Sequence, residues 1–173
     1  AAPGGVAGCG EAGLPYLAPL NCVDTGLSGW KLTPAAGADS GKLPLVRWQV
    51  DAALARVAAK PGDCSLNVNN GKDLTCGAGQ AAVLATADTP RFDASALAKT
   101  TPLLLRFESG GTWSNAYKAQ VLASTDDAAF SLLATLPANG ASWNKIQLGL
   151  NGFAGSKFRL RFRLQAKDCA SPQ

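Results

Sequence analysis

The sequence predicts an all-β protein, folded as a two-sheet antiparallel β-sandwich of the jelly-roll kind. From Gly29 onward, short runs of apolar, β-branched and aromatic residues alternate with clusters of Gly, Pro, Asn and Asp. Roughly ten such runs follow one another, which is typical of two packed sheets. The length of 173 residues suits one domain. We therefore expect a flexible Ala/Gly-rich lead-in over 1–13, a sandwich domain over 14–169 and a short tail over 170–173.

The expected strands are defined by these runs and by the turn residues between them. They cover 30–33, 45–50, 65–68, 72–75, 81–85, 103–108, 116–124, 130–135, 143–150 and 157–166. The Ala-rich segment 51–59 is the only candidate helix, and Pro61 and Gly62 would end it after two turns. Trp30 and Trp48 are expected in the core.

The last strand has the clearest alternation. Its apolar set is Phe158, Leu160, Phe162, Leu164 and Ala166, and its polar set is Lys157, Arg159, Arg161, Arg163, Gln165 and Lys167. One face therefore belongs to the core and the other to water. Cations spaced roughly 6.6 to 6.8 Å apart suit the repeated sulfate, carboxylate or phosphate groups of an anionic polymer. The alternative is a solvated face that protects the sheet against aggregation.

A hairpin is predicted between Cys64 and Cys76. Asn70-Gly71 is a strong turn signal, and the register that it sets places the two cysteines directly opposite each other. Opposed residues of an antiparallel pair lie roughly 4.5 to 5.5 Å apart, a distance that a disulfide spans. We therefore expect a Cys64–Cys76 disulfide.

The cysteine count indicates an oxidising compartment. Five cysteines predict two disulfides and one leftover thiol. Cys9 with Cys22 is the favoured second pair, and Cys22 with Cys169 is the alternative. Zinc is the competing interpretation, but the chain has no Cys-x-x-Cys pair and no His. The absence of Met and the small residues at the start indicate that a leader has been removed, as after export.

The absence of His excludes several classes of enzyme, including those with Ser-His-Asp or Cys-His nucleophiles. The one adjacent pair of carboxylates, Asp126-Asp127, follows Ser124-Thr125 and is expected to be solvated on a turn. No stretch approaches the roughly 20 apolar residues of a membrane-spanning helix. We expect no catalysis, no nucleic-acid partner and no transmembrane segment.

Read in order, several motifs resemble the cleaved-adhesin or choice-of-anchor jelly-roll domain of bacterial surface and secreted proteins, a relative of MAM-type and galactose-binding-like sandwiches. The motifs are Leu14-Pro15-Tyr16 with Gly29-Trp30, Trp48-Gln49-Val50, Pro90 to Ser95, Leu103 to Phe107, Val121 to Asp127, Trp143 to Leu150, Gly152 to Gly155 and Phe158 to Leu164. The resemblance spans roughly 14–167. It implies a jelly-roll fold and a role in adhesion or ligand binding.

The chain departs from that family at two places. It carries Asn21-Cys22-Val23-Asp24 and Lys118-Ala119 where the family has acidic residues, so the resemblance gives little support to structural calcium. It also stops at Gln173 without the family's closing strand. The open edge that this implies would pair with a partner segment or a second molecule, or be covered by the first 20 residues.

Aromatic and amide side chains supply the other candidate sites. Trp113, Tyr117 and Trp143 lie near Gly-rich or polar stretches, and exposed rings there would stack on sugars. No cofactor is expected. Asn67, Asn69, Asn70 and Asp73 are the alternative, as oxygen ligands for calcium.

We expect a non-catalytic binding or adhesion module, secreted or held at the cell surface, for a carbohydrate or an anionic polymer. Its candidate ligand-binding residues are Trp113, Tyr117, Trp143, Arg159, Arg161 and Arg163. The alternative is a structural or assembly domain completed by a partner chain. An accessory domain of a secreted hydrolase is the third interpretation.

Overall fold

The computed structural model describes residues 11–16, 29–33, 48–51, 64–68, 84–111, 113 and 117–166. Strands dominate these residues, which contain no α-helix and one short 3-10 turn, η3 (Asn151–Phe153). The predicted all-β class is therefore confirmed. In the same residues, no helix has the length and apolar character needed to cross a membrane.

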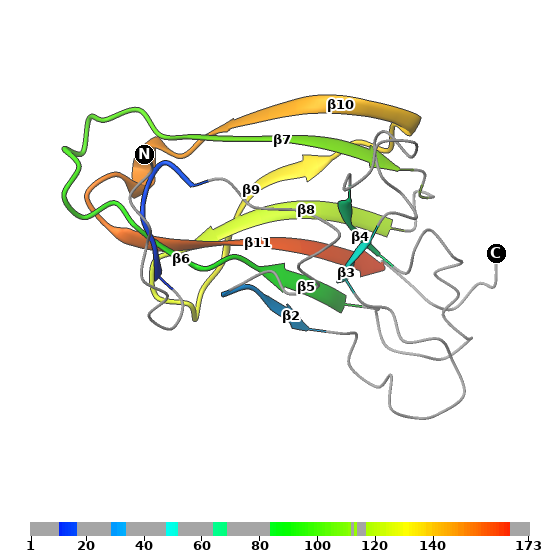
Figure 1. Cartoon of the computed structure of the whole chain (residues 1–173), viewed down its shortest axis with the longest axis horizontal. Coiled ribbons are helices and arrows are strands. Elements are labelled where there is room, and N and C mark those ends of the chain that lie inside the picture. The colour runs from blue at the N-terminus through cyan, green and yellow to red at the C-terminus, as the bar shows by residue number, and fades with distance from the viewer. Residues whose placement is uncertain are drawn as a thin grey trace.

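The strands follow one another as Figure 1 shows. They are β1 (Glu11–Ala12), β2 (Lys31–Thr33), β3 (Trp48–Asp51), β4 (Ser65–Val68), β5 (Leu84–Asp88), β6 (Arg91–Asp93), β7 (Leu104–Gly111), β8 (Tyr117–Ser124), β9 (Ser131–Leu136), β10 (Gly140–Gly149) and β11 (Lys157–Ala166).

Seven strands form the large sheet, and β11 lies at its centre. On one side β11 pairs antiparallel with β8, and β8 pairs with β9. On its other side β11 pairs first with β6 and then with β5. These two short strands form one bent path along β11, because Thr89 between them is hydrogen-bonded to Leu160. The Thr89 amide donates to the Leu160 carbonyl at 3.0 Å, and the Leu160 amide donates to the Thr89 hydroxyl at 3.1 Å. Strands β2 and β1 follow outside β5 and β6.

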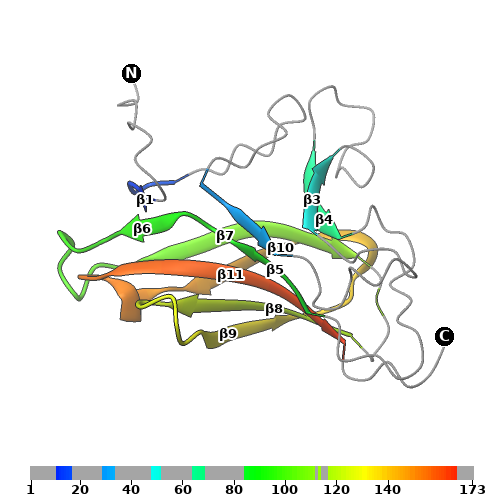
Figure 2. The same cartoon turned by 90° about the horizontal axis from the view of Figure 1, so that it is seen from below.

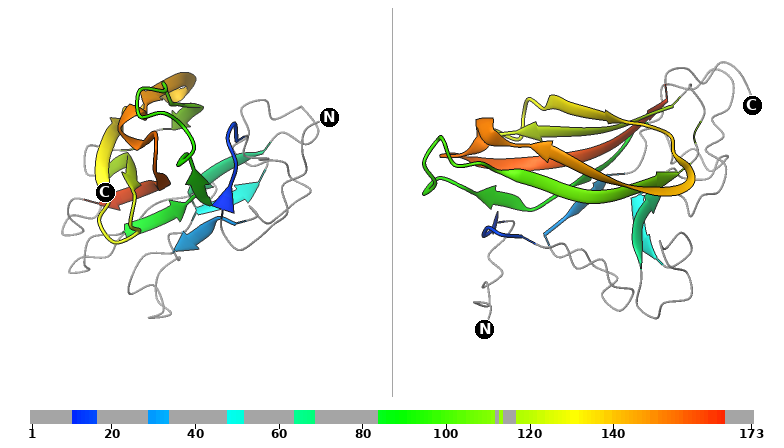
Figure 3. Two further views of the ribbon diagram at one scale, coloured as in Figure 1. Left: turned by 90° about the vertical axis from the view of Figure 1, so that its left-hand side faces the viewer. Right: turned by 90° about the horizontal axis from the view of Figure 1, so that it is seen from above.

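A second layer covers one face of the large sheet. It contains the antiparallel pair β7–β10, here called the small sheet, and the two-stranded β3–β4 ribbon. The end-on view in Figure 3 shows β7 and β10 stacked over the large sheet, with the β3–β4 ribbon on the same side. Figure 2 shows β9, β8, β11 and β5 in sheet order with β7 and β10 behind them. The arrangement is sandwich-like, and the finer jelly-roll connectivity stays a prediction.

The core lies between the two layers because alternation points one face of each strand inwards. Phe158 and Leu160 of β11 are each 2 % exposed and pack with Phe92, Ala123 and Leu150. Strand β7 reaches across the layers, where the Phe107 ring meets the Phe162 ring edge-on with centroids 5.5 Å apart.

Both tryptophans expected in the core are half-buried and anchored by their indole N–H groups. Trp30 stacks on Phe162 and donates to the Tyr16 hydroxyl at 3.1 Å. Trp48 donates to the carbonyl of Ala85 at 3.1 Å, which ties the β3–β4 ribbon to the large sheet.

The observed strands follow the predicted ones closely except around β5 and β6. Strands β4 and β11 match the predicted 65–68 and 157–166. Strand β5 lies three residues later than the predicted 81–85, and β6 was not predicted. The predicted strand 72–75 and residues 52–59 of the candidate helix lie outside the described residues, while Asp51 ends strand β3.

The sheet begins earlier than the predicted domain boundary. Glu11 and Ala12, assigned to the lead-in, pair in parallel with β6 and so lie beside the large sheet. Strand β11, the last of the described strands, is flanked on both sides rather than placed at an edge. Association through an open edge stays a prediction.

Candidate functional site

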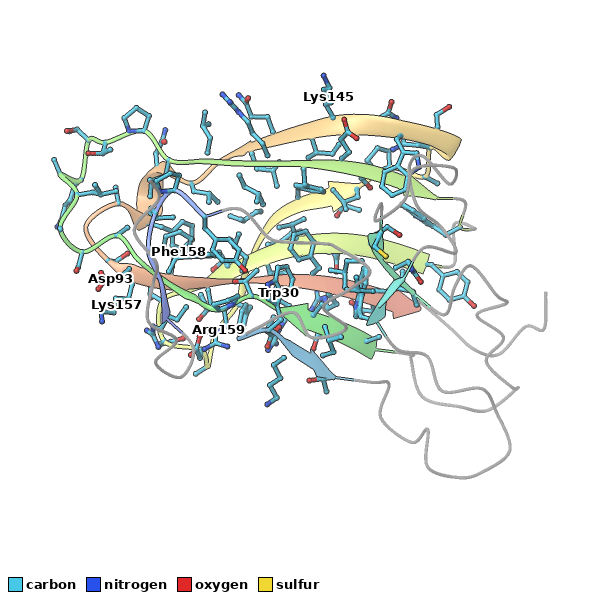
Figure 4. The ribbon with its side chains drawn as sticks, viewed as in Figure 1. Trp30, Asp93, Lys145, Lys157, Phe158 and Arg159 are labelled. Atoms are coloured by element: carbon cyan, nitrogen blue, oxygen red, sulfur yellow. The ribbon has the colours of Figure 1, made fainter. Side chains whose placement is uncertain are left out.

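The outer face of β11, which points away from the second layer, carries the predicted row of cations. Figure 4 shows Phe158 and Arg159 on opposite sides of the strand, and Lys157 beside Asp93. Three of these cations contact carboxylates of the fold.

Arg161 makes the strongest of these contacts. Its Nε and Nη2 bind the two carboxylate oxygens of Asp88 at 2.6 and 2.7 Å, because the register places the two residues opposite each other. Its guanidinium carbon also lies 3.8 Å from the centre of the Phe130 ring. The hydrogen bonding that Arg161 donates to the Asp88 carboxylate is the main cause of its raised pKa. The Asp88 side chain is only 7 % exposed, so this pair is structural.

Arg159 and Arg91 hold the loop between β8 and β9. Asp127 adopts a left-handed conformation (φ 62°) and accepts from Arg159 Nε at 3.0 Å and from Arg91 Nη1 at 3.2 Å. Arg91 also donates to the Thr125 carbonyl. Together with Phe130, these contacts fix the loop on the outer face of the large sheet.

Lys157 completes the set of paired cations, since its ammonium lies 3.3 Å from Asp93. Lys157, Arg159 and Arg161 therefore do not form an unbroken row of solvated cations. Their charges are largely compensated within the fold.

The adjacent carboxylates Asp126 and Asp127 have structural partners. Asp126 accepts from the amides of Ala128 and Ala129 at 2.9 and 3.0 Å and from the Ser124 hydroxyl at 2.8 Å. These hydrogen bonds, led by that from Ala129, lower the pKa of Asp126 to about 2. A carboxyl group that is ionised to such low pH is a poor general acid at neutral pH.

Arg163 differs from its neighbours on β11. Its Nε and Nη2 donate to one acceptor, the amide oxygen of Gln120, at 3.0 and 2.6 Å. The described residues provide it with no carboxylate. Burial and the nearby charge of Arg161 lower the pKa of Arg163.

On the opposite side of the molecule, Trp143 lies over Gly110. The two atoms shared by the indole rings, Cδ2 and Cε2, lie 3.1 and 3.3 Å from the position that a Cβ of Gly110 would take. The Ser142 carbonyl oxygen lies slightly closer to that position, at 3.0 Å, and the two central atoms are the nearest of the indole, which places the face of the ring over the strand. Alternation along β7 points Gly110 to the outer surface of the small sheet, and the Trp143 ring lies on that side of it. Lys145 belongs to the same surface, and Figure 4 shows it projecting outwards.

Trp113 and Tyr117 are placed differently. Trp113 approaches Gly111 with the edge of its ring, since its outer atom Cζ3 lies 2.8 Å from the would-be Cβ position. The backbone of Gly111 (φ +148°) also favours glycine at this point. Tyr117 begins β8 in the inward phase of the strand, opposite Ala166, and burial raises its pKa. The structure therefore singles out Trp143 from the three predicted aromatic residues.

The row beside Trp143 is charged. Glu108 and Lys145 are directly paired across β7 and β10, one outward position away from Gly110 and Trp143. Lys145 is exposed and Glu108 is half-exposed. A flat aromatic surface thus lies next to a carboxylate and an ammonium on one face.

The cysteine and calcium predictions fall largely outside the described residues. Cys64 is disulfide-bonded, and Cys76 lies outside the described residues, so the pairing of these two cysteines stays a prediction. Cys9, Cys22 and Cys169 also lie outside. Of the proposed calcium ligands only Asn67 is described; it is buried and donates to the Ser65 carbonyl at 3.4 Å. The described residues contain no cluster of three or more Asp, Glu, His or Cys side chains that could hold a metal ion.

Sequence reasoning missed Gly110 and Asp88, which give Trp143 and Arg161 their settings. Only the strand register could have revealed either of them. Compared with known proteins, the sequence matches no protein-family model and no curated protein.

Proposed function

We propose that this chain is a non-catalytic, extracellular carbohydrate-binding module whose aromatic platform is Trp143. The observation that carries the proposal is the face-on seating of the Trp143 indole over Gly110 on the outer surface of the small sheet. Trp143 is half-buried, with one side of its ring against the backbone, and in this proposal the ligand packs on the other side. An aromatic surface held flat in this way suits the apolar face of a sugar ring.

The neighbouring polar groups favour a sugar over a purely apolar ligand. Sugars combine C–H surfaces with hydroxyl groups that both donate and accept hydrogen bonds. Lys145 can donate to such hydroxyls, and Glu108 can accept from them, at roughly 6.8 Å along the strands from the platform. The disulfide at Cys64 agrees with an extracellular location.

Carboxylates near the basic strand do not favour an enzyme. Asp88, Asp93, Asp126 and Asp127 each accept hydrogen bonds or ion pairs from the fold itself. These contacts support a binding function over acid–base chemistry.

Affinity electrophoresis tests the proposal. The protein is run through gels that contain neutral polysaccharides, namely hydroxyethylcellulose, xylan, galactomannan and a β-glucan. We expect retardation by at least one of them, and at least tenfold weaker binding for Trp143→Ala, or about 1.4 kcal/mol. Leu104→Ala is the matched control, because Leu104 is an exposed apolar residue (48 %) at the far end of β7.

A second variant tests the geometry of the platform rather than the presence of the ring. Gly110→Val places a side chain against both the Trp143 indole and the Ser142 carbonyl, so the ring and the adjoining β10 backbone must shift. We expect it to weaken binding while all four tryptophans remain. Full binding by both Gly110→Val and Trp143→Ala would overturn the proposal.

The β9 edge favours an assembly role as a second candidate. Among the described strands β9 pairs only with β8, and its Ser131–Leu136 sequence contains no charge or proline to discourage further pairing. Leu132 is 54 % exposed there. Light scattering tests this role: a dimer that Leu132→Lys converts to a monomer supports it, and a monomeric wild type excludes it.

A further inference from the structure

One cation of the outer β11 face, Arg163, has no carboxylate partner within the part of the chain that the structure describes. Lys157, Arg159 and Arg161 face Asp93, Asp127 and Asp88. Arg163 contacts only the neutral oxygen of Gln120 among the described residues. The positive charge of this face is therefore concentrated at the Arg163 end of the strand.

The contact with Gln120 orients Arg163 without neutralising it. Nε and Nη2 converge on the same amide oxygen, so the guanidinium plane is fixed while Nη1 makes no hydrogen bond within the described structure. Gln120 is itself 8 % exposed and opposite Arg163 in the register, which holds the acceptor in place. An oriented, partly desolvated guanidinium binds an oxyanion at a lower entropic cost than a free surface arginine does.

Lys118 adds a second uncompensated charge. It lies two residues before Gln120 on β8, opposite Gln165 and on the same outer face as Arg163. It is exposed and makes no ion pair within the described residues. Thr86 lies opposite Arg163 on β5, and Thr135 lies opposite Gln120 on β9, so hydroxyl groups border the two cations.

We propose that Arg163 and Lys118 form an oxyanion site that takes a sulfate or carboxylate group of an acidic polysaccharide. Arg163 supplies the fixed N–H donors and Lys118 a mobile ammonium. The site lies on the large sheet, so it is independent of the Trp143 platform on the small sheet.

Heparin and alginate columns test the site with sulfate and carboxylate groups respectively. At low salt we expect the wild type to be retained and Arg163→Gln to bind at least tenfold more weakly. Arg106→Gln is the matched control: it removes the same charge from an arginine that likewise donates to a glutamine, Gln147, at 3.0 Å on the small sheet. Retention should fall steeply with salt, since the Debye length is about 10 Å at 0.1 M.

Two further arms identify the ligand. Trp143→Ala should keep full retention on both columns, which separates this site from the platform. If Arg163→Gln and Arg106→Gln lose retention equally, net charge alone explains the binding, and the proposed site is wrong. Two results would overturn the assignment to a polysaccharide. One is elution from heparin by inorganic sulfate as efficiently as by soluble heparin at the same concentration of sulfate groups. The other is binding to duplex DNA that is tighter than binding to heparin and is abolished by Arg163→Gln. Arg163→Lys keeps the positive charge but loses the planar set of guanidinium N–H donors, so we expect it to bind both columns more weakly than the wild type.

Discussion

Replacing Arg161 by Met should destabilise the fold strongly, although the residue lies on the outer face of a sheet. The substitution removes both hydrogen bonds to Asp88 and the contact with the Phe130 ring, and leaves a carboxylate that is 7 % exposed without its cation. Breaking a buried pair in this way costs about 3 to 5 kcal/mol. Because the Arg161 side chain is 28 % exposed, water offsets part of this cost, and we expect about 2 to 4 kcal/mol.

Urea unfolding with linear extrapolation measures this loss. For a domain of this length it corresponds to a decrease in Tm of roughly 5 to 15 °C. Arg106→Met is the control. Arg106 is exposed, and among the described residues its side chain hydrogen-bonds to Gln147, so the change should alter stability by less than about 0.5 kcal/mol.

The double variant Arg161→Met/Asp88→Asn identifies the cause. If the cost comes from the uncompensated Asp88 carboxylate, the double variant is more stable than Arg161→Met alone. A loss for Arg161→Met no larger than for Arg106→Met would refute the structural role that we assign to the pair.

Three further changes probe the fold. Phe158→Ala should cost about 3 to 5 kcal/mol in urea unfolding because the ring is 2 % exposed in the main core; a cost below 1 kcal/mol would contradict its central place. Cys64→Ser should lower Tm and reduce the further decrease in Tm that a reducing agent causes, whereas unchanged Tm would argue against a stabilising disulfide. Asp126 has a folded pKa of about 2 and an ordinary value of 3.8, so the unfolded chain binds more protons between these values and stability falls as pH drops from about 4 to 2. Asp126→Asn should flatten that fall in thermal melts, and an unchanged pH profile would contradict the pKa assignment.

The alternation of apolar and polar residues predicted those strands that have one face in the core and the other in solvent. Strand β11 keeps strict alternation over its whole length, and its predicted bounds are correct. Strand β6 was missed because its three residues follow Pro90 and are too few to show a period. Its strand conformation depends on pairing with Lys157 and Phe158, which are far away in the sequence.

The candidate site was less predictable because long-range register decides it. The row of cations on β11 was visible, but their partners were not: Asp88 precedes Arg161 by 73 residues, and an aspartate at the end of an Ala-rich run looks like a strand breaker. Trp143 was one of three aromatic residues that the sequence made candidates for sugar stacking. That a glycine of β7 would lie beneath its ring required knowledge of the pairing between β7 and β10.

The most direct test of the carbohydrate proposal is a titration followed through the indole N–H signals of the four tryptophans by NMR. The ligands are soluble oligosaccharides of the polysaccharides used in the gels, and single Trp→Phe variants assign the signals. The Trp143 signal should shift with saturation. The signals of Trp30 and Trp48, which are half-buried and donate their indole N–H groups to Tyr16 and Ala85, should stay in place. A Trp143 signal that does not move with any of these sugars, or shifts confined to Trp30 and Trp48, would contradict the platform.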